Sequence, residues 1–322
     1  MTAPTISRVA TDDEVATWRE EGWVLVEGLI GTDEIDAAAD DLGLLFPTVE
    51  EYFADPDGEL ERRRGRPLLP KEAYAWPDEG PGFRAEQQQW MGAFPFGGNG
   101  ALNRLCVHPS LVDFAGRALD TDDLRLYQAH ATAKYAGLVN YEQPMHTDRN
   151  HSWLPPVGHA PWWNLTGFLY LSDVTPDENP TLIVSTRDTA NIDPPFPVLL
   201  PNMDRDIYDL ERPAPGVRGS YLAYRSDVWH RGAAFGGSHT ARYTLGLSFK
   251  RGDHEWIGYD TQQSRSTGEP WTNFVEGSTP RDLALFGFPG PGHLIWTDEL
   301  LAETQKRYPK LDLTPWREAL GE

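Results

Sequence analysis

His146 and Asp148 stand two positions apart near the middle of the chain, and side chains of these types can bind a metal ion. An imidazole and a carboxylate at this spacing can supply two ligands, and a third can come from a distant part of the sequence. We expect His230 to be that third ligand. Read alone, the pair is also compatible with two polar residues of a loop, so the segments around it must decide between the two interpretations.

Arg242, shortly after His230, adds a second kind of chemistry. Its predicted strand, residues 242–250, alternates between apolar odd-numbered residues and an opposite face that carries Arg242, Thr244 and Ser248. A guanidinium on a polar interior face can bind a carboxylate through two parallel, charge-assisted hydrogen bonds. Two histidines and one carboxylate leave metal positions open for such an anionic ligand, as in non-haem Fe(II) oxygenases.

A strand predicted to start at Leu124 should line the same space. Its even-numbered residues, from Leu124 to Lys134, are expected to share one face, and they include Gln128 and His130. A polar row on an interior strand indicates the wall of a cavity rather than a dry core.

Helices and further strands should surround these segments. Thr11 begins a capping box with Glu14, and Gly22 should end the helix that follows. Thr32 should cap a second helix, and Pro109 fits the first turn of a third. The other expected elements are strands at 23–30, 164–172, 181–185 and 219–225, a proline-rich loop or lid at 191–215, and a closing helix from about Pro315 after a turn-rich region from Gly252.

The composition limits the possible partners. Lys and Arg number 28 against 49 Asp and Glu, which gives a net charge of −21 and opposes binding to nucleic acid or anionic membranes. A single cysteine, Cys106, excludes an internal disulfide and any multi-cysteine zinc site. No leader or membrane-spanning stretch is evident, so we expect a cytoplasmic protein that acts on a small molecule.

The ordered set of His146, Asp148, His230 and Arg242, with a strand before the first pair, resembles Fe(II)/2-oxoglutarate-dependent oxygenases of the phytanoyl-CoA dioxygenase-like family. The resemblance implies a mainly β fold with flanking helices around a double-stranded β-helix, the jelly-roll or cupin-like core. His146, Asp148 and His230 would then bind Fe(II), and Arg242 would pair with the distal carboxylate of 2-oxoglutarate. O2 would take the remaining metal position, and Gln128 would contact the co-substrate.

The resemblance also implies one dioxygenase domain over residues 1–322. It would comprise a mostly helical part at 1–120, the jelly-roll core with the metal site at 121–252, and a C-terminal extension at 253–322. The implied activity is hydroxylation of a small or medium-sized organic substrate, for example in secondary metabolism, with release of succinate and CO2. Asp148 favours hydroxylation, desaturation or cyclisation over halogenation, because the related halogenases have a small residue in place of the carboxylate.

Arg149, Trp153 and Trp163 lie near the pair in sequence and are candidates for substrate contacts. Two other classes of protein stay open. A non-catalytic jelly-roll binding module would keep these residues for structure, and a jelly-roll metalloenzyme could work without 2-oxoglutarate. Arg242 discriminates between the enzymes, because only the use of 2-oxoglutarate gives this side chain a ligand. The segment 184–187 departs from the family, which commonly has a Pro-Gly-Ser-His-like turn there.

Overall fold

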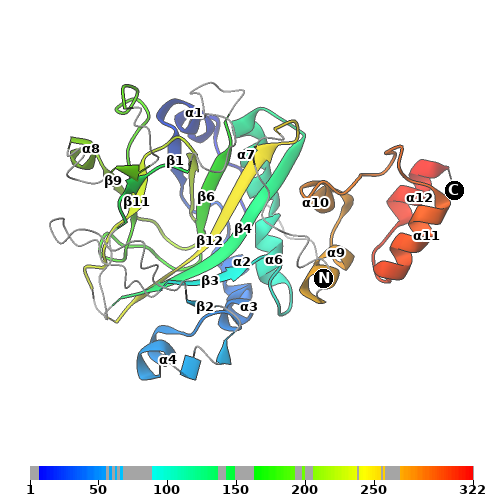
Figure 1. The fold of residues 1–322 in the computed structure, drawn as a ribbon, viewed down its shortest axis with the longest axis horizontal. Helices are drawn as coiled ribbons and strands as arrows, with labels where there is room; N and C mark the ends of the chain where they lie inside the picture. The colour runs from blue at the N-terminus through cyan, green and yellow to red at the C-terminus, as the bar shows by residue number, and fades with distance from the viewer. Residues whose placement is uncertain are drawn as a thin grey trace.

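Two antiparallel sheets form the centre of the molecule (Figure 1). In the described residues, the larger sheet has seven strands and the smaller sheet has five. The larger sheet has the spatial order β1 (Trp23–Val26), β10 (Tyr221–Arg225), β6 (Leu165–Tyr170), β12 (Ala241–Arg251), β4 (Leu124–Tyr135), β3 (Gln89–Ala93) and β2 (Arg66–Pro67). The smaller sheet has the order β8 (Val198–Leu199), β5 (Met145–His146), β11 (His230–Gly232), β7 (Thr181–Ile183) and β9 (Arg212–Ala214).

This arrangement is a double-stranded β-helix with flanking helices, so the predicted fold is confirmed. The computed structural model describes residues 7–55, 58–59, 62–63, 66–67, 89–136, 143–148, 163–192, 198–199, 206–237, 239–254, 257 and 269–321.

Helices pack on the outer face of the larger sheet, where α1 contacts β1 and α7 contacts β4, β6 and β12 (Figure 1). α1 begins with the predicted capping box of Thr11 and Glu14, and it ends at Gly22, whose φ of 81° suits glycine. The helices are α1 (Asp12–Glu21), α2 (Thr32–Ala37), α3 (Ala39–Gly43), α4 (Val49–Ala54), α6 (Ala101–Cys106), α7 (Pro109–Leu119), α8 (Asp206–Asp209), α9 (Glu269–Glu276), α10 (Pro280–Ala284), α11 (Asp298–Arg307) and α12 (Thr314–Leu320).

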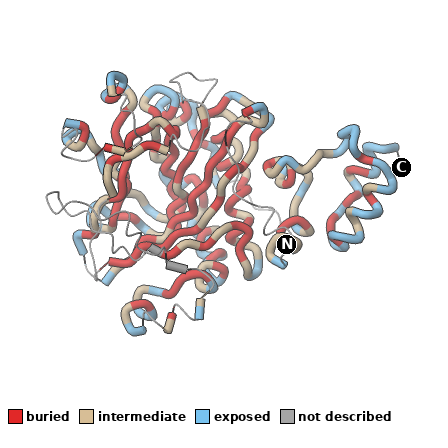
Figure 2. Tube along the Cα trace, in the orientation of Figure 1, coloured by how far each residue is buried: buried red, intermediate tan, exposed pale blue. Residues whose placement is uncertain are grey.

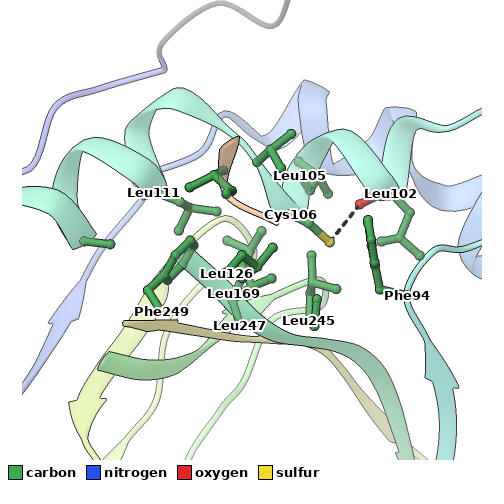
Figure 3. Packing of buried hydrophobic residues seen from close by; sticks show 14 of the residues in the cluster. Phe94, Leu102, Leu105, Cys106, Leu111, Leu126, Leu169, Leu245, Leu247 and Phe249 are labelled. Carbon is green, nitrogen blue, oxygen red and sulfur yellow. Dashed lines mark hydrogen bonds between the residues drawn. The ribbon is translucent and has the colours of Figure 1, made fainter. Parts of the chain in front are cut away.

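The main hydrophobic core lies between these helices and the larger sheet, whose strands are buried along most of their length (Figure 2). Leu111 of α7 and Leu105 of α6 meet Leu245, Leu247 and other apolar residues of the sheet (Figure 3). Cys106 is buried in the same layer, where its thiol donates to the carbonyl of Leu102 at 3.6 Å, and burial raises its pKa. Because this face of the sheet is filled by side chains, a ligand must bind on the opposite face.

The polar face of β4 begins later than predicted. The register between β12 and β4 shifts by one residue after Ser248, which leaves Tyr127 as the extra residue of a β-bulge. Leu124 and Leu126 consequently pack in the main core, so their predicted place on the polar face was wrong. The alternation predicted for β12 is confirmed along the strand.

Several element boundaries also differ from the prediction. The second helix is split into α2 and α3, and its N-cap is Gly31 rather than Thr32. The strand expected at 23–30 ends at Val26. The region after Gly252, predicted to be rich in turns, contains α9, α10 and α11 before the predicted closing helix α12. Part of the loop expected at 191–215 lies outside the described residues, and its described part contains β8, α8 and β9.

Candidate metal centre

His146, Asp148 and His230 converge at one end of the smaller sheet, and each offers a ligand atom within 4.8 Å of the others. The two histidines are cross-strand partners on β5 and β11. Their rings lie 4.4 Å apart between centroids, and Nε2 of His230 lies 3.8 Å from Oδ2 of Asp148. The structure therefore brings together the three residues that the sequence indicated, and their spacing suits a single divalent ion.

Backbone carbonyls orient both imidazoles. Nδ1–H of His146 donates to the carbonyl of Pro144 at 2.8 Å, and Nδ1–H of His230 donates to that of Val228 at 3.0 Å. A carbonyl oxygen can only accept, so Nδ1 carries the proton in each neutral ring and Nε2 keeps its lone pair. This arrangement of the outer nitrogen is the one that metal-binding histidines commonly use. The donor set therefore fits Fe(II).

Tyr224 holds the carboxylate of Asp148. Its hydroxyl donates to Oδ2 at 3.3 Å, and its ring lies 4.4 Å from the ring of His230. Burial, and next the charge of Asp148, raise the pKa of Tyr224 well above its usual value, so the phenol stays a donor. The sequence did not reveal this role, because residues 221–225 read as an apolar strand.

A polar row continues from Tyr224 across the larger sheet. Thr166, Ser248 and Gln128 follow one another as cross-strand neighbours on β6, β12 and β4. The side chain of Thr166 contacts the hydroxyl of Tyr224. Its own hydroxyl donates to Oγ of Ser248 at 2.8 Å, and Ser248 donates to Oε1 of Gln128 at 3.2 Å. Asp148 is thus connected to the strand that carries Gln128, and the amide nitrogen of Gln128 remains a donor on the cavity wall.

A cavity of about 250 Å3 lies between the two sheets and adjoins the three candidate ligands. Its size suits a small organic molecule. The described residues that line it are Met91, Gln128, His130, Thr132, Lys134, Gln143, His146, Asp148, Thr166, Gly167, Phe168, Thr181, Tyr224, His230, Arg231, Gly232, Arg242 and Gly246.

Arg242 reaches into this cavity from β12 and is only 4 % exposed. Its Nη1 donates to the carbonyl of Asn179 and, at 3.3 Å, to Oδ1 of the same residue, while Nη2 lies 3.5 Å from Oγ1 of Thr181. The guanidinium also lies 5.5 Å from the ring of Phe168. Burial lowers the pKa of Arg242. These contacts hold the guanidinium group in place through neutral partners. Its positive charge is therefore available to a ligand that carries a negative charge.

Lys134 is a second buried cation in the cavity, and no specific role was predicted for it from the sequence. It lies on β4 directly opposite Arg242 and is 7 % exposed. Burial, and next the charge of Arg242, lower its pKa well below the usual value for lysine. The sequence did place Lys134 at the end of the polar face of β4, and this position was the signal that could have indicated a role in the cavity.

Trp163 is the one residue predicted to contact a substrate that lies in the described part of the chain. Arg149 and Trp153 lie outside the described residues. Trp163 packs edge-on against Trp18 at 5.7 Å, and the guanidinium of Arg225 lies 4.3 Å from its ring centroid. These contacts give Trp163 a packing role at the edge of the main core, and its contact with a substrate stays a prediction.

A larger hollow, of about 430 Å3, lies between the 96–104 segment and α9. Its charged lining residues are two cations, Arg104 and Lys310, and two anions, Glu269 and Glu276, so the positive and negative charges offset each other. The three candidate metal ligands lie in the smaller cavity between the sheets, which we therefore take as the functional site.

No family model matches the chain, and no curated protein matches it. Solved structures with the same fold include the epimerase SnoN in complex with Fe3+, alpha ketoglutarate and nogalamycin RO, at 16 % identity and a TM-score of 0.51 over 74 % of this chain and 83 % of that one. The carbocyclase SnoK from nogalamycin biosynthesis gives 18 % identity and a TM-score of 0.52 over 82 % and 93 % of the two chains. HygX from Streptomyces hygroscopicus, with nickel and 2-oxoglutarate bound, has 12 % sequence identity and a TM-score of 0.50. The match covers 80 % of this chain and 99 % of that one.

At these low sequence identities, the similarity to solved structures establishes the fold alone. The chain therefore shares the double-stranded β-helix of non-haem enzymes that use 2-oxoglutarate, and it carries a two-histidine, one-carboxylate cluster in that fold. Among the described helices, none combines the length and the apolar character that crossing a bilayer requires.

Proposed function

We propose that this protein is an Fe(II)- and 2-oxoglutarate-dependent oxygenase that acts on a small or medium-sized organic molecule. The observation that carries the proposal is the convergence of His146, Asp148 and His230, with both histidines oriented by backbone carbonyls. The three side chains would hold the ion on one face and leave the opposite face open. When bound, Fe(II) with 2-oxoglutarate and O2 would supply the oxidising power that removes hydrogen from the substrate, with release of succinate and CO2.

Arg242 supports the choice of 2-oxoglutarate as the co-substrate. Its buried fork faces the cavity and has neutral protein partners, so a carboxylate is the ligand that would balance its charge. A metalloenzyme that does not use 2-oxoglutarate would leave this cation without a ligand. Gln128, at the end of the polar row from Tyr224, would contact the co-substrate through its amide nitrogen.

Hydroxylation is the reaction that we propose, in a single domain of the phytanoyl-CoA dioxygenase-like type. Asp148 is a carboxylate, and its contact with Tyr224 fixes it beside His230. A full ligand set of this kind favours oxygen transfer or another outcome of hydrogen removal over halogenation. The epimerase and the carbocyclase that share the fold are named for other outcomes, so cyclisation and epimerisation remain within the same chemistry. Arg149, Trp153 and Trp163 stay candidates for contacts with the substrate.

The test is succinate formation from 2-oxoglutarate. In the absence of the organic substrate, we expect slow, uncoupled conversion that requires both Fe(II) and O2. His146→Ala and Arg242→Ala should each abolish this conversion, because the first removes a metal ligand and the second removes the anchor for the co-substrate. Exposed Arg187→Ala should leave it unchanged. Succinate formation that persists without Fe(II), or in His146→Ala, would contradict the proposal.

A further inference from the structure

Lys134 and Arg242 form a pair of adjacent buried cations on the cavity face of the larger sheet. They are direct cross-strand partners on β4 and β12 and are 7 % and 4 % exposed. In the described part of the chain, neither side chain forms an ion pair with a carboxylate, and the hydrogen-bond partners of Arg242 are neutral. Two like charges that share a buried position repel each other, and each loses hydration. An anion in the cavity would offset both costs.

The two cations point to the same end of the cavity. Nη2 of Arg242 lies 3.5 Å from Oγ1 of Thr181, and Thr181 is the cross-strand partner of Gly232. A Cβ atom added to Gly232 would lie 3.0 Å from Nζ of Lys134 and 2.9 Å from Oε1 of Gln143. Glycine at this position therefore leaves the room that the ammonium group occupies. The guanidinium and the ammonium group converge on the Thr181–Gly232 pair.

This end of the cavity lies at a suitable distance from the metal ligands. Gly232 follows His230 by two residues on β11, and a strand advances about 3.3 Å per residue, so the Cα atoms of these two residues are about 7 Å apart along the strand. That span suits a five-carbon dicarboxylate whose 2-oxo acid end is held at the metal. A monocarboxylic 2-oxo acid held in the same way would place a methyl group between the two cations.

Lys250 shows how the chain satisfies a buried lysine that has a structural role. It is 0 % exposed, and its Nζ donates to the carbonyls of His254 at 3.0 Å and Ile257 at 2.8 Å. Lys134 has no such pair of backbone carbonyls among the described residues: its Nζ lies at the cavity wall, where the neutral amide oxygen of Gln143 is close to the same position beside Gly232. The difference indicates a ligand rather than the fold as the partner of Lys134.

We propose that Lys134 is the second cation of the distal carboxylate subsite, and that together with Arg242 it makes the site selective for a dicarboxylic over a monocarboxylic 2-oxo acid. This inference rests on the proposed function, because it presumes that the 2-oxo acid end is held at the metal. Lys134 acts here on the co-substrate's binding and selectivity and has no part in the proposed chemistry at the metal.

The test compares two ligands of equal chain length, 2-oxoglutarate and 2-oxopentanoate, by anaerobic calorimetric titration of the Mn(II)-loaded protein. Lys134→Met should weaken the binding of 2-oxoglutarate about 10- to 100-fold, the loss expected for a hydrogen bond between charged groups. It should change the binding of 2-oxopentanoate less than about 2-fold, because that acid has no distal carboxylate. Lys134→Gln, which keeps a polar group, provides a second variant if the first folds poorly.

Lys306→Met is the control, because it removes one positive charge from an exposed helix and should leave both affinities unchanged. Equal losses for the two acids in Lys134→Met, or wild-type affinity for 2-oxoglutarate in both Lys134 variants, would overturn the inference and leave the proposed function standing. A wild-type protein that binds neither acid with Mn(II) present would overturn the proposed function itself.

Discussion

The carboxylate of Asp148 is held by a hydrogen bond from Tyr224. Tyr224 donates to its Oδ2 at 3.3 Å, and Thr166, the cross-strand partner of Tyr224, contacts the tyrosine hydroxyl. A partner of this kind fixes the direction of a ligand without touching the metal, and removing it typically weakens metal affinity by about 10- to 100-fold. Tyr224 is therefore a positioning residue for the proposed iron site.

Tyr224→Phe should lower the affinity for Fe(II) by about 10-fold, because the substitution removes the donor and keeps the ring beside His230. The affinity can be measured anaerobically by competition with a chelator. Tyr170→Phe is the matched control, since this hydroxyl, one strand away, donates to the carbonyl of Ala214. Equal affinities in wild type and Tyr224→Phe would show that the tyrosine does not position Asp148.

Lys134 should make the stability of the ligand-free protein depend on pH. Its pKa is lowered in the folded state, so between that lowered value and the unfolded value of about 10.4 the unfolded chain binds more protons. Lys134 therefore lowers the free energy of unfolding most when the pH is at or below its folded-state pKa. This destabilisation disappears as the pH rises through about 10.4. Lys134→Met should be more stable than wild type at neutral pH, with a difference that shrinks at alkaline pH.

Denaturant unfolding at a series of pH values checks this prediction. Parallel stability profiles for wild type and Lys134→Met would show that Lys134 does not carry the burial penalty that its surroundings indicate. Lys306→Met serves again as the control for the loss of one charge.

At the residue scale, the sequence was sufficient to indicate the three candidate ligands that the structure brings together and the polar face that carries Arg242. It was not sufficient for Tyr224 or Lys134. The role of Tyr224 depends on the register that aligns β10 with β6, and that of Lys134 depends on its pairing with Arg242. Both are long-range relationships, which the alternation within a single strand does not contain.

At the scale of elements, the bulge in β4 shows how a local irregularity changes a prediction. Strict alternation put Leu124 and Leu126 on the face of Gln128, but the extra residue reverses their direction and returns them to the core. Nothing in the segment from Leu124 to Lys134 marks the bulge, because Tyr127 is as suitable for a regular strand as for a bulge.

The helices after residue 252 could have been found more completely. Thr279 and Asp282 form a capping box for α10, with Pro280 in its first turn, and Thr297 caps α11. These are the same signals that correctly predicted α1. The abundance of Gly and Pro in this part of the chain concealed them, since short helices joined by turns read much like a series of turns.

Gly167 provides a test of how closely the strands of the larger sheet approach one another. A Cβ at this position would lie 2.4 Å from the carbonyl oxygen of Leu222 on β10 and 2.8 Å from the ring of Tyr221. Gly167→Ala should therefore destabilise the protein by about 1–3 kcal/mol, the usual cost of forcing extra volume into a packed interior. The free energy of unfolding measures the effect.

Gly43→Ala is the control for the glycine substitution, because a Cβ there meets no atom within 4 Å at the end of α3. Alanine should be neutral or stabilise by up to about 1 kcal/mol at that position. If Gly167→Ala proves as well tolerated as Gly43→Ala, β6 and β10 are not packed as tightly as described.

At the scale of the whole molecule, the charge of the cavity opposes the charge of the protein. The net charge is −21, yet the cavity between the sheets contains Lys134 and Arg242 as buried cations. A net negative charge of this size repels polyanions, whereas the two cations of this one site suit a small dianion. The contrast agrees with a small-molecule co-substrate.

Metal and co-substrate should stabilise the folded state together, since both bind residues that only the fold assembles. With Mn(II) bound and 2-oxoglutarate at 100 times its dissociation constant, the free energy of unfolding should rise by about 2.7 kcal/mol from the acid alone. Calorimetric melting under anaerobic conditions measures the rise as a higher melting temperature. An Arg242→Ala protein that gains the same stabilisation would contradict the assignment of the distal carboxylate to this end of the cavity.

The central claim is that His146, Asp148 and His230 hold an Fe(II) ion to which 2-oxoglutarate binds directly. Anaerobic addition of Fe(II) and then 2-oxoglutarate, followed by visible absorption, tests this claim most directly. The wild-type protein should develop a weak charge-transfer band that requires both additions, and His146→Ala and Asp148→Ala should not develop it. The absence of the band from the wild type, or its persistence in both variants, would contradict the claim.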